Sequence, residues 1–286
     1  MNINFYHRNY AMGQAKLGLG HKTLIMGILN VTPDSFSDGG KYNSVDLALI
    51  RALQMIEEGA DIIDIGGEST RPGHHAVDEQ EELERVIPII KAIHDHAPHI
   101  PLSIDTYKAK VAQEALNAGA HIINDVWGFK HDPKMANVAA EYQCPIILMH
   151  NRKEHQYQNL MIDIKSDLLE SVSIALDAGV SKENIILDPG IGFAKDYTEN
   201  IQVMRALDEL VNLGYPMLLA TSRKRFIRTV LQVDVKGTLL GTAATVALGI
   251  AQGCQIVRVH DIAEIKQTVK MCDAIIYAEP DISVQE

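Results

Sequence analysis

The chain is poor in cysteine, in aromatic side chains and in long apolar segments. Of its 286 residues, 3 are cysteine and 5% are aromatic. Three cysteines at irregular spacing give neither a disulfide framework nor a metal-ligand pattern, so we expect buried thiols and the reducing environment of the cytoplasm. No apolar run approaches the ~18 residues of a membrane span, and the N-terminus has no apolar signal segment. We therefore expect no membrane partner.

Basic residues are also in the minority. Lys and Arg number 26 against 37 Asp and Glu, which gives a net charge of −11. This charge disfavours non-specific binding to nucleic acid or acidic membranes. Hydrophobic residues make up 47% and charged residues 22% of the chain, which excludes a disordered or collagen-like protein. Within this acidic chain, Arg223, Lys224 and Arg225 form a compact basic run that calls for an explanation.

Short apolar runs alternate with amphipathic segments along most of the chain. The eight apolar runs cover residues 24–30, 62–66, 102–105, 121–124, 145–149, 185–188, 217–220 and 255–259. The amphipathic segments have apolar residues at three- and four-residue spacing and cover 45–58, 78–94, 109–118, 160–178, 200–213 and 239–251. Near-continuous apolar runs are typical of parallel strands that are covered on both faces. The pattern predicts an α/β protein with one (β/α)8 domain, a TIM barrel.

A doubly wound open sheet is the competing fold. It would typically have a glycine-rich phosphate turn after its first strand. Here that strand ends at Asn30 and continues as Val-Thr-Pro-Asp-Ser-Phe, which favours the barrel. Residues 1–22 fall outside the repeat, and we expect them to cap the bottom of a barrel domain that covers residues 23–280.

Polar side chains stand at the ends of most predicted strands. Catalytic groups of TIM barrels lie at the C-terminal ends of strands, so residues far apart in the sequence should meet at one face. The strand-end residues are Asn30, Gly66, Gly67, Glu68, Asp105, Asn124, Met149, His150, Asp188, Thr221, Ser222, Arg258 and His260. Their convergence, more than any one of them, predicts a functional site.

Asp105, Asn124 and Asp188 suit a flat heterocycle. Carboxylates accept hydrogen bonds and an amide both donates and accepts, which matches a ring with several N–H donors and ring acceptors. Each residue also has an ordinary explanation. Asp105 could cap the next helix, Asn124 could lie in a turn, and Asp188 precedes Pro189-Gly190, a turn sequence.

The basic run and the last strand both favour an anionic ligand. Ser222 resembles a helix N-cap, which would place the three cations in a first turn where each opposes the helix dipole by ~0.3–1 kcal/mol. A ligand contacted by Lys224 would explain them, and a solvated basic corner is the alternative. Arg258 and His260, two residues apart, share one face of their strand and could bind an anion, with Arg258 also able to stack on a ring. The alternative for Arg258 is a salt bridge inside the barrel.

Two loops are unusual in composition. Residues 30–40 and 66–73 contain paired glycines and hydroxyl side chains, which are typical of mobile lids. Asn30, Asp34 and Asp38 are hard oxygen donors that could hold a Mg²⁺ ion. Arg71, in the second loop, could bind the same anion or be solvated.

Seven motifs together resemble those of bacterial dihydropteroate synthases, and the resemblance covers nearly the whole chain. They occupy residues 30–40 (Asn-Val-Thr-Pro-Asp-Ser-Phe-Ser-Asp-Gly-Gly), 66–73 (Gly-Gly-Glu-Ser-Thr-Arg-Pro-Gly), 103–106 (Ser-Ile-Asp-Thr), 123–125 (Ile-Asn-Asp), 188–193 (Asp-Pro-Gly-Ile-Gly-Phe), 222–226 (Ser-Arg-Lys-Arg-Phe) and 258–261 (Arg-Val-His-Asp).

The resemblance implies a transferase. It would condense 6-hydroxymethyl-7,8-dihydropterin diphosphate with p-aminobenzoate, give 7,8-dihydropteroate and pyrophosphate with Mg²⁺ as cofactor, and act as a homodimer. By similarity, the residues fall into four groups: the pterin would be held by Asp105, Asn124, Met149, Asp188, Lys224 and Arg258; the diphosphate by Asn30, Thr70, Arg71, Arg258 and His260, with Mg²⁺ at Asn30; p-aminobenzoate, or a sulfonamide, by Phe36, Pro72 and Ser222; and catalysis would rest on Asp34, Lys224, Asp188 and Arg258.

Two rival functions and three departures accompany this resemblance. A pterin-dependent methyltransferase domain shares the barrel and the Asp/Asn/Asp set, but it would not need the intact segment Ser222-Arg223-Lys224 or the diphosphate loop. A pterin-binding module without catalysis is the second rival. The departures from the common family pattern are Ala220, Asp196 and Arg228, and none of them removes a proposed site residue.

Overall fold

Eight parallel strands form the centre of the molecule. The computed structural model describes residues 4–31, 41–68 and 77–277. Within these, the strands are β3 (Leu24–Asn30), β4 (Ile62–Gly66), β5 (Leu102–Asp105), β6 (Ile122–Asp125), β7 (Ile146–Met149), β8 (Ile185–Asp188), β9 (Leu218–Leu219) and β10 (Ile256–Val259). They are hydrogen-bonded in the order β8-β7-β6-β5-β4-β3-β10-β9. A bridge between Leu187 and Met217 joins β8 to β9, so the sheet closes into a barrel.

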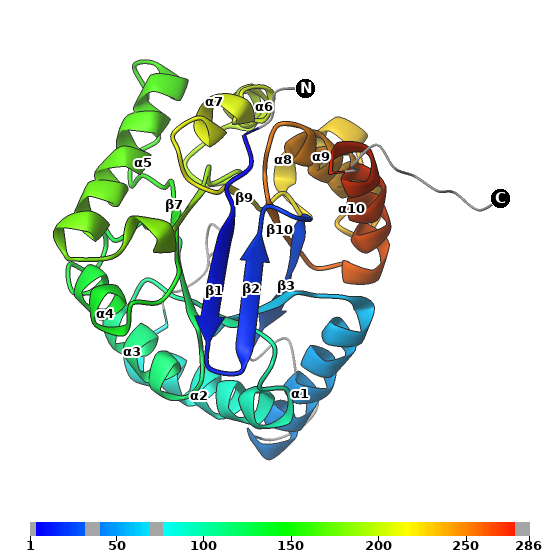
Figure 1. The fold of residues 1–286 in the computed structure, drawn as a ribbon. Coiled ribbons are helices and arrows are strands. Elements are labelled where there is room, and N and C mark those ends of the chain that lie inside the picture. Colours follow the sequence, from blue (N-terminus) through cyan, green and yellow to red (C-terminus); the bar gives the residue numbers. More distant parts are fainter. Residues whose placement is uncertain (1–3, 32–40, 69–76, 278–286) are drawn as a thin grey trace.

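Helices surround the barrel in a ring (Figure 1). They are α1 (Lys41–Glu58), α2 (Glu79–His96), α3 (Ala109–Asn117), α4 (Met135–Tyr142), α5 (Leu160–Asp177), α6 (Tyr197–Arg205), α7 (Leu207–Val211), α8 (Arg225–Leu231), α9 (Leu239–Ala251) and α10 (Ile262–Ile276), with 3₁₀ turns at Lys182–Asn184 and Lys236–Thr238. The predicted TIM barrel is therefore confirmed.

The apolar side chains of the strands fill two separate cores. Those that point inward form a layer inside the barrel, made of Leu24, Met26, Ile62, Ile122, Ile147, Ile186, Leu218 and Ile256. Those that point outward pack beneath the helices, as Ile25 and Val257 do. Because side chains alternate along a strand, nearly continuous apolar runs are needed to fill both cores, which is the pattern seen in the sequence.

An antiparallel hairpin of β1 (Arg8–Met12) and β2 (Ala15–Leu19) lies across the middle of the helix ring (Figure 1). Its side chains Tyr10, Leu17 and Leu19 pack on the inner barrel layer. The Tyr10 hydroxyl donates to the Glu183 carbonyl at 2.7 Å. The hairpin therefore covers the N-terminal end of the strands and leaves the C-terminal end uncovered by it. The domain boundary between residues 1–22 and 23–280 stays a prediction.

All eight predicted strands are present, with bounds within one residue of the prediction, and one predicted helix is divided in two. Strands β3, β4, β5 and β8 begin and end at the predicted residues. Residues 200–213 were expected to form one helix but contain the end of α6 and all of α7. The prediction is wrong because Ala206 has φ −122° and ψ 29°, outside the helical region. The hairpin, α4 and α10 were not among the predicted segments.

No single helix in the described part of the chain is long and apolar enough to span a membrane. One bent pair, Arg225–Leu231 with Lys236–Ala251 at an angle of 83°, meets the length and composition criteria together. All three cysteines are unpaired, and Cys144 and Cys254 are buried as predicted.

Candidate active site

Three predicted polar residues meet at the C-terminal end of the barrel. Asp105 ends β5 and pairs in register with Asn124 of β6, while Asp188 ends β8. All three side chains are buried. Asp105 does not cap α3, because Lys108 takes the N-cap position of that helix. The N-cap explanation of Asp105 is therefore wrong.

Arg258 of β10 connects this group. Its Nε donates to Asp64 Oδ2 at 2.6 Å, and its Nη2 donates to Asp105 Oδ2 at 2.7 Å. The salt bridge that the sequence left open as an alternative is thus present, and it lies among the residues of the candidate site. Because two carboxylates accept from different nitrogens of the guanidinium, the plane of this group is held in one orientation.

Asp64 is a site residue that the sequence reasoning missed. It lies in the middle of β4 and is fully buried. Besides Arg258, its Oδ2 accepts a hydrogen bond from Asn124 Nδ2 at 3.1 Å. A carboxylate inside the apolar run 62–66 is itself a signal, since a buried charge requires a partner. That signal was available in the sequence.

The electrostatics of the pair Asp105 and Arg258 follow from burial. Burial raises the pKa of Asp105 to about 7, with the Arg258 guanidinium opposing and the Asp64 carboxylate adding to the shift. Burial alone would lower the pKa of Arg258, but the two carboxylates outweigh it and raise that pKa. Among the described residues, Asp105 Oδ1 and Asp64 Oδ1 are buried acceptors with no donor within hydrogen-bond distance. Such atoms suit a ligand rich in N–H groups.

One carboxylate oxygen of Asp188, at the end of β8, accepts a hydrogen bond within a turn. Its Oδ1 accepts a hydrogen bond from the Gly190 amide at 2.7 Å, so the predicted turn exists. Burial raises the pKa of Asp188 to about 6, opposed by the Gly190 amide and by the cations of Lys224 and Arg258. At neutral pH the ionised carboxylate is therefore the major form.

The segment after β9 differs from its prediction. Ser222 was expected to be a helix N-cap, but α8 begins at Arg225 and Lys224 takes the N-cap position. The prediction is wrong because Arg223 has a left-handed backbone, φ 60°, which no helix can include. The Lys224 amide donates to the Thr221 carbonyl at 3.1 Å and closes a tight turn.

This turn separates the three basic residues. Arg223 forms an ion pair with Asp261, and Arg225 is exposed. Lys224 places its ammonium 4.2 Å from the centre of the Phe193 ring. Lys224 is thus the member of the run that lies against the loop following Asp188.

Ser222 and His260 contact each other. The Ser222 hydroxyl lies 2.9 Å from His260 Nδ1 and accepts a hydrogen bond from the His260 amide at 3.2 Å. His260 follows β10 on the face of Arg258, while Val257 and Val259 are fully buried on the other face, as predicted. Ser222 therefore belongs beside the expected anion-binding residues.

The structure describes only some of the remaining predicted site residues. Asn30 ends β3 opposite Gly66, and Met149 ends β7 opposite Asp188 with its side chain buried. Both stand at the same end of the barrel as the other strand ends. Asp34, Phe36, Asp38, Thr70, Arg71 and Pro72 lie outside the described residues.

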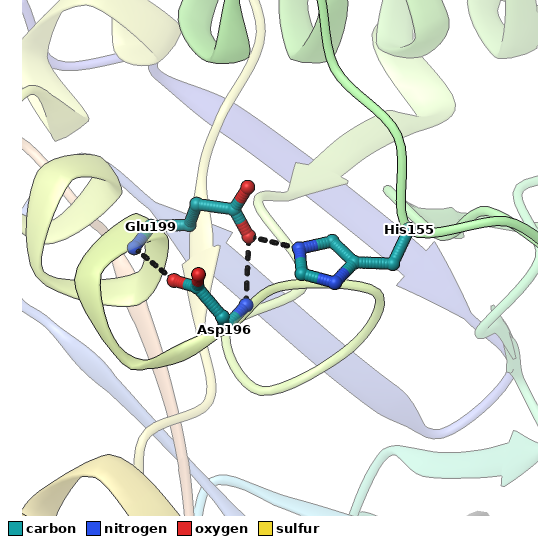
Figure 2. Close-up of side chains that lie close together, drawn as sticks. All are labelled: His155, Asp196 and Glu199. Atoms are coloured by element: carbon teal, nitrogen blue, oxygen red, sulfur yellow. Dashed lines mark hydrogen bonds and ion pairs between the residues drawn. The ribbon is translucent and has the colours of Figure 1, made fainter.

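One further group of polar side chains lies close together at the start of α6 (Figure 2). The ligand atoms of His155, Asp196 and Glu199 lie within 4.8 Å of one another. The two carboxylates form a capping box, since Asp196 accepts from the Glu199 amide at 2.8 Å and Glu199 accepts from the Asp196 amide at 2.7 Å. His155 contacts Glu199 as well. The helix cap accounts for this cluster, and Asp196 is a favourable N-cap residue.

Comparison with known proteins agrees with this geometry. The family model described as pterin binding enzyme matches residues 26–260. A dihydropteroate synthase from Bacillus subtilis is 61% identical over 260 residues, which is 91% of each chain. The chain belongs to the dihydropteroate synthase family. As a member of this family it is a transferase.

Solved structures of the family have the same fold. A dihydropteroate synthase from Clostridium difficile, crystallised in the presence of pteroic acid, is 53% identical with a TM-score of 0.88 and covers 91% of this chain and 98% of its own. The dihydropteroate synthase from Xanthomonas albilineans with 4-aminobenzoic acid is 36% identical with a TM-score of 0.90. The match covers 96% of this chain and 100% of the Xanthomonas chain.

Proposed function

We propose that the chain condenses 6-hydroxymethyl-7,8-dihydropterin diphosphate with p-aminobenzoate and releases 7,8-dihydropteroate and pyrophosphate. The observation that carries the proposal is the set of buried Asp105, Asn124 and Asp188 with the partly buried Arg258 in the barrel mouth. Pteroic acid with the Clostridium difficile protein and 4-aminobenzoic acid with the Xanthomonas albilineans protein support both substrates.

The pterin would lie among the strand-end residues. The unpaired Asp105 Oδ1 and the second oxygen of Asp188 would accept from pterin N–H groups, and Asn124 would complement them. Lys224 would donate to a ring carbonyl or nitrogen. The fixed guanidinium of Arg258 would stack on the ring, with Met149 as an apolar neighbour.

The diphosphate would be bound by Arg258 and His260, together with Asn30, Thr70 and Arg71. His260 adjoins Ser222, which we place with Phe36 and Pro72 in the p-aminobenzoate site. This contact would join the diphosphate and p-aminobenzoate subsites. Sulfonamides would compete for the same site as p-aminobenzoate.

Mg²⁺ is the proposed cofactor, and the donor present fits it. The amide oxygen of Asn30 is a hard ligand at the end of β3, and Mg²⁺ usually takes one or two protein oxygens beside phosphate and water. When bound, the ion would neutralise charge on the departing diphosphate.

Chelation of Mg²⁺ should weaken binding of the diphosphate substrate at least tenfold and change binding of the free pterin by less than twofold. Equal losses in a titration of both ligands would contradict this assignment.

The chemistry we propose is dissociative. Arg258 and His260 would stabilise the negative charge that grows on pyrophosphate. Electron-rich dihydropterin can delocalise the positive charge left at its methylene, and the ionised carboxylate of Asp188, assisted by Asp34, would stabilise it. The weakly nucleophilic aryl amine then attacks from the other side while water is excluded. Oxygen-18 scrambling in the recovered diphosphate substrate supports this order, whereas an isotope effect of associative displacement would rule it out.

We also propose a homodimer in the cytoplasm. Helices α8, α9 and α10 are neighbours (Figure 1). Large apolar side chains on them are exposed, namely Val230 of α8, Leu240 and Leu248 of α9, and Met271 and Ile275 of α10. An apolar surface of this kind supports association of two copies. Sedimentation equilibrium should give twice the monomer mass of 31.6 kDa, and a single 31.6 kDa species would count against the dimer.

The proposed function is tested by product analysis. Purified protein supplied with both substrates and Mg²⁺ should form 7,8-dihydropteroate, identified by mass spectrometry. Absence of this product from folded protein would refute the proposal.

A further inference from the structure

The loop between β8 and α6 has a demanding backbone. Within residues 189–195, Gly190, Gly192 and Ala194 have positive φ values of 65°, 85° and 45°. A side-chain carbon added at Gly190 would lie 2.0 Å from the His150 carbonyl oxygen. Glycine adopts such φ values readily, but alanine does not, so the left-handed backbone of Ala194 persists only where surrounding contacts fix it.

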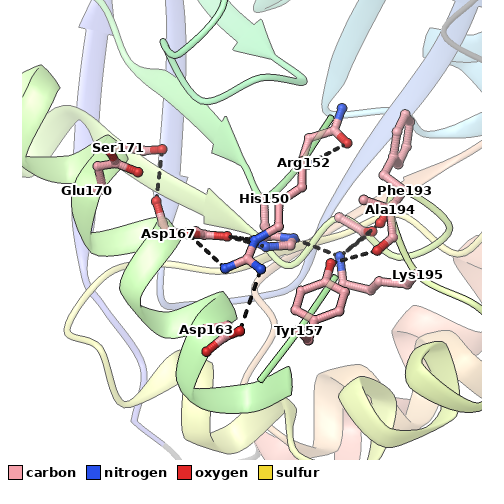
Figure 3. Close-up of polar contacts among 12 residues, drawn as sticks. His150, Arg152, Tyr157, Asp163, Asp167, Glu170, Ser171, Phe193, Ala194 and Lys195 are labelled. Carbon is pink, nitrogen blue, oxygen red and sulfur yellow. Dashed lines mark hydrogen bonds and ion pairs between the residues drawn. The ribbon is translucent and has the colours of Figure 1, made fainter. Parts of the chain in front are cut away.

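Lys195 supplies those contacts (Figure 3). Its partly buried side chain turns back into its own loop, where Nζ donates to the carbonyls of Gly190 at 3.0 Å and Phe193 at 3.1 Å. The third contact of Nζ is His150 Nδ1 at 2.8 Å, just after the end of β7. One ammonium thus joins two points of the loop to the neighbouring strand.

His150 is held in one tautomer by its two partners. The Asp167 carboxylate can only accept, so Nε2–H donates to its Oδ2 at 3.0 Å, and Nδ1 of the neutral ring accepts from Lys195 Nζ at 2.8 Å. Burial lowers the pKa of Lys195 to about 7, so the ammonium that supplies all three donors predominates below about pH 7. Burial lowers the pKa of His150 to about 4, in agreement with a neutral ring. Arg152 also donates to Asp167 (Figure 3). The side chains therefore form one chain of contacts in the order Lys195, His150, Asp167 and Arg152.

The loop that Lys195 holds contacts two proposed pterin ligands. The Gly190 amide donates to Asp188 Oδ1, and the Phe193 ring lies beneath the Lys224 ammonium. A side-chain carbon added at Gly192 would lie 3.0 Å from Lys224 Cδ, so the backbone also packs on the lysine stem. The position of Asp188 and Lys224 therefore depends on this loop.

We propose that Lys195, through His150 and its own loop carbonyls, is a positioning residue that sets Asp188 and Lys224 for the pterin ring. The inference rests on the proposed function and deepens it. Without the ammonium, two carbonyls and an imidazole nitrogen lose their donor, and the strained loop relaxes. The pterin site then loses its geometry, while the diphosphate residues on β3 and β10 keep theirs.

The principal test is Lys195→Met, which keeps the stem and removes the ammonium. Below the unfolding temperature, KM for the dihydropterin diphosphate and Kd for free pterin should rise about tenfold. Kd for inorganic pyrophosphate with Mg²⁺ should change by less than twofold. Lys153→Met, an exposed lysine on the segment after β7, is the matched control and should behave as wild type in all three measurements.

A pair of substitutions at His150 tests the same link from the other side. His150→Asn keeps an acceptor near the Nδ1 position and should retain pterin affinity within about threefold. His150→Leu removes the acceptor and should approach the loss seen in Lys195→Met. Equal effects of Asn and Leu would overturn the proposed contact. These two His150 variants test the proposal even if Lys195→Met fails to fold.

Two further outcomes decide between positioning and simple stabilisation. Wild-type pterin affinity in Lys195→Met, together with a lowered Tm, would overturn the proposal. In wild type, nitrogen-15 NMR of His150 should show the Nε2–H tautomer from pH 5 to 8, and the Nδ1–H form would also overturn it. If wild type makes no dihydropteroate, the proposed function fails, but the pterin Kd and NMR results still decide the role of Lys195.

Discussion

The candidate site depends on individual buried charges whose partners come from different strands. Strand-terminal residues such as Asp105 and Asp188 could be predicted, because the ends of the apolar runs are visible in the sequence. Asp64 could not be predicted by that rule, since it stands inside a strand and its significance lies in contacts to Arg258 and Asn124 across the barrel. The contacts of Lys195 were missed for a related reason, because a side chain that folds back into its own loop leaves no periodic pattern.

Asp64→Asn should weaken both stability and pterin binding. The substitution removes the charge that pairs with Arg258 Nε, leaving Asp105 as the carboxylate partner of the guanidinium. Disturbing a buried ion pair costs about 3–5 kcal/mol when one partner is lost, so we expect a loss of roughly 2–4 kcal/mol in urea denaturation. Pterin Kd should rise at least tenfold.

Ser103→Ala is the matched control for this change. Ser103 lies opposite Asp64 in register and is equally buried, and its hydroxyl has no hydrogen-bond partner among the described residues. Its removal should leave pterin Kd unchanged. If Asp64→Asn behaves like Ser103→Ala, the role assigned to Asp64 is wrong.

The raised pKa values of Asp105 and Asp188 predict a pH-dependent pterin affinity. Both pKa values are raised by burial, to about 7 and about 6. The ionised carboxylates accept from the ring, so affinity should fall as pH falls through 7 and 6. Burial lowers the pKa of Lys195 to about 7, so loss of its ammonium should weaken affinity again as the pH rises above that value. Calorimetric titrations from pH 5 to 8 would check this, and Asp188→Asn should remove the step near pH 6. A flat profile in wild type would contradict the assignment.

Elements were predicted well where periodicity is long and poorly where one residue decides the backbone. The strand runs and the long helices follow from apolar spacing. The break at Ala206 and the start of α8 at Arg225 do not, because they depend on single non-helical conformations at Ala206 and Arg223. Sequence spacing averages over several residues and carries little information on one dihedral pair.

Asp196→Ala should destabilise the start of α6. It removes one half of the capping box with Glu199 and should lower the free energy of unfolding by about 1 kcal/mol. Asp196→Thr keeps a capping oxygen and should recover most of that loss. Urea denaturation of the three proteins checks the prediction, and equal stabilities of the Ala and Thr variants would contradict it.

At the scale of the whole molecule, a net charge of −11 gives no indication of the ligand. The acidic surface and the proposed anion site coexist because the barrel brings Lys224 to the same end as Arg258 and His260, which belong to a different segment. The hairpin β1–β2 covers the other end. The sequence allowed the barrel and the location of its mouth to be predicted, whereas the pairing of charges inside that mouth required the three-dimensional structure.

The central claim is that this mouth transfers the pterin methylene to p-aminobenzoate. The most direct measurement is pyrophosphate release from dihydropterin diphosphate, with and without p-aminobenzoate, alongside the dihydropteroate formed. We predict sustained release that depends on p-aminobenzoate and equals dihydropteroate mole for mole. Tight pterin binding with no p-aminobenzoate-dependent release would contradict the claim and identify a pterin-binding module without this activity.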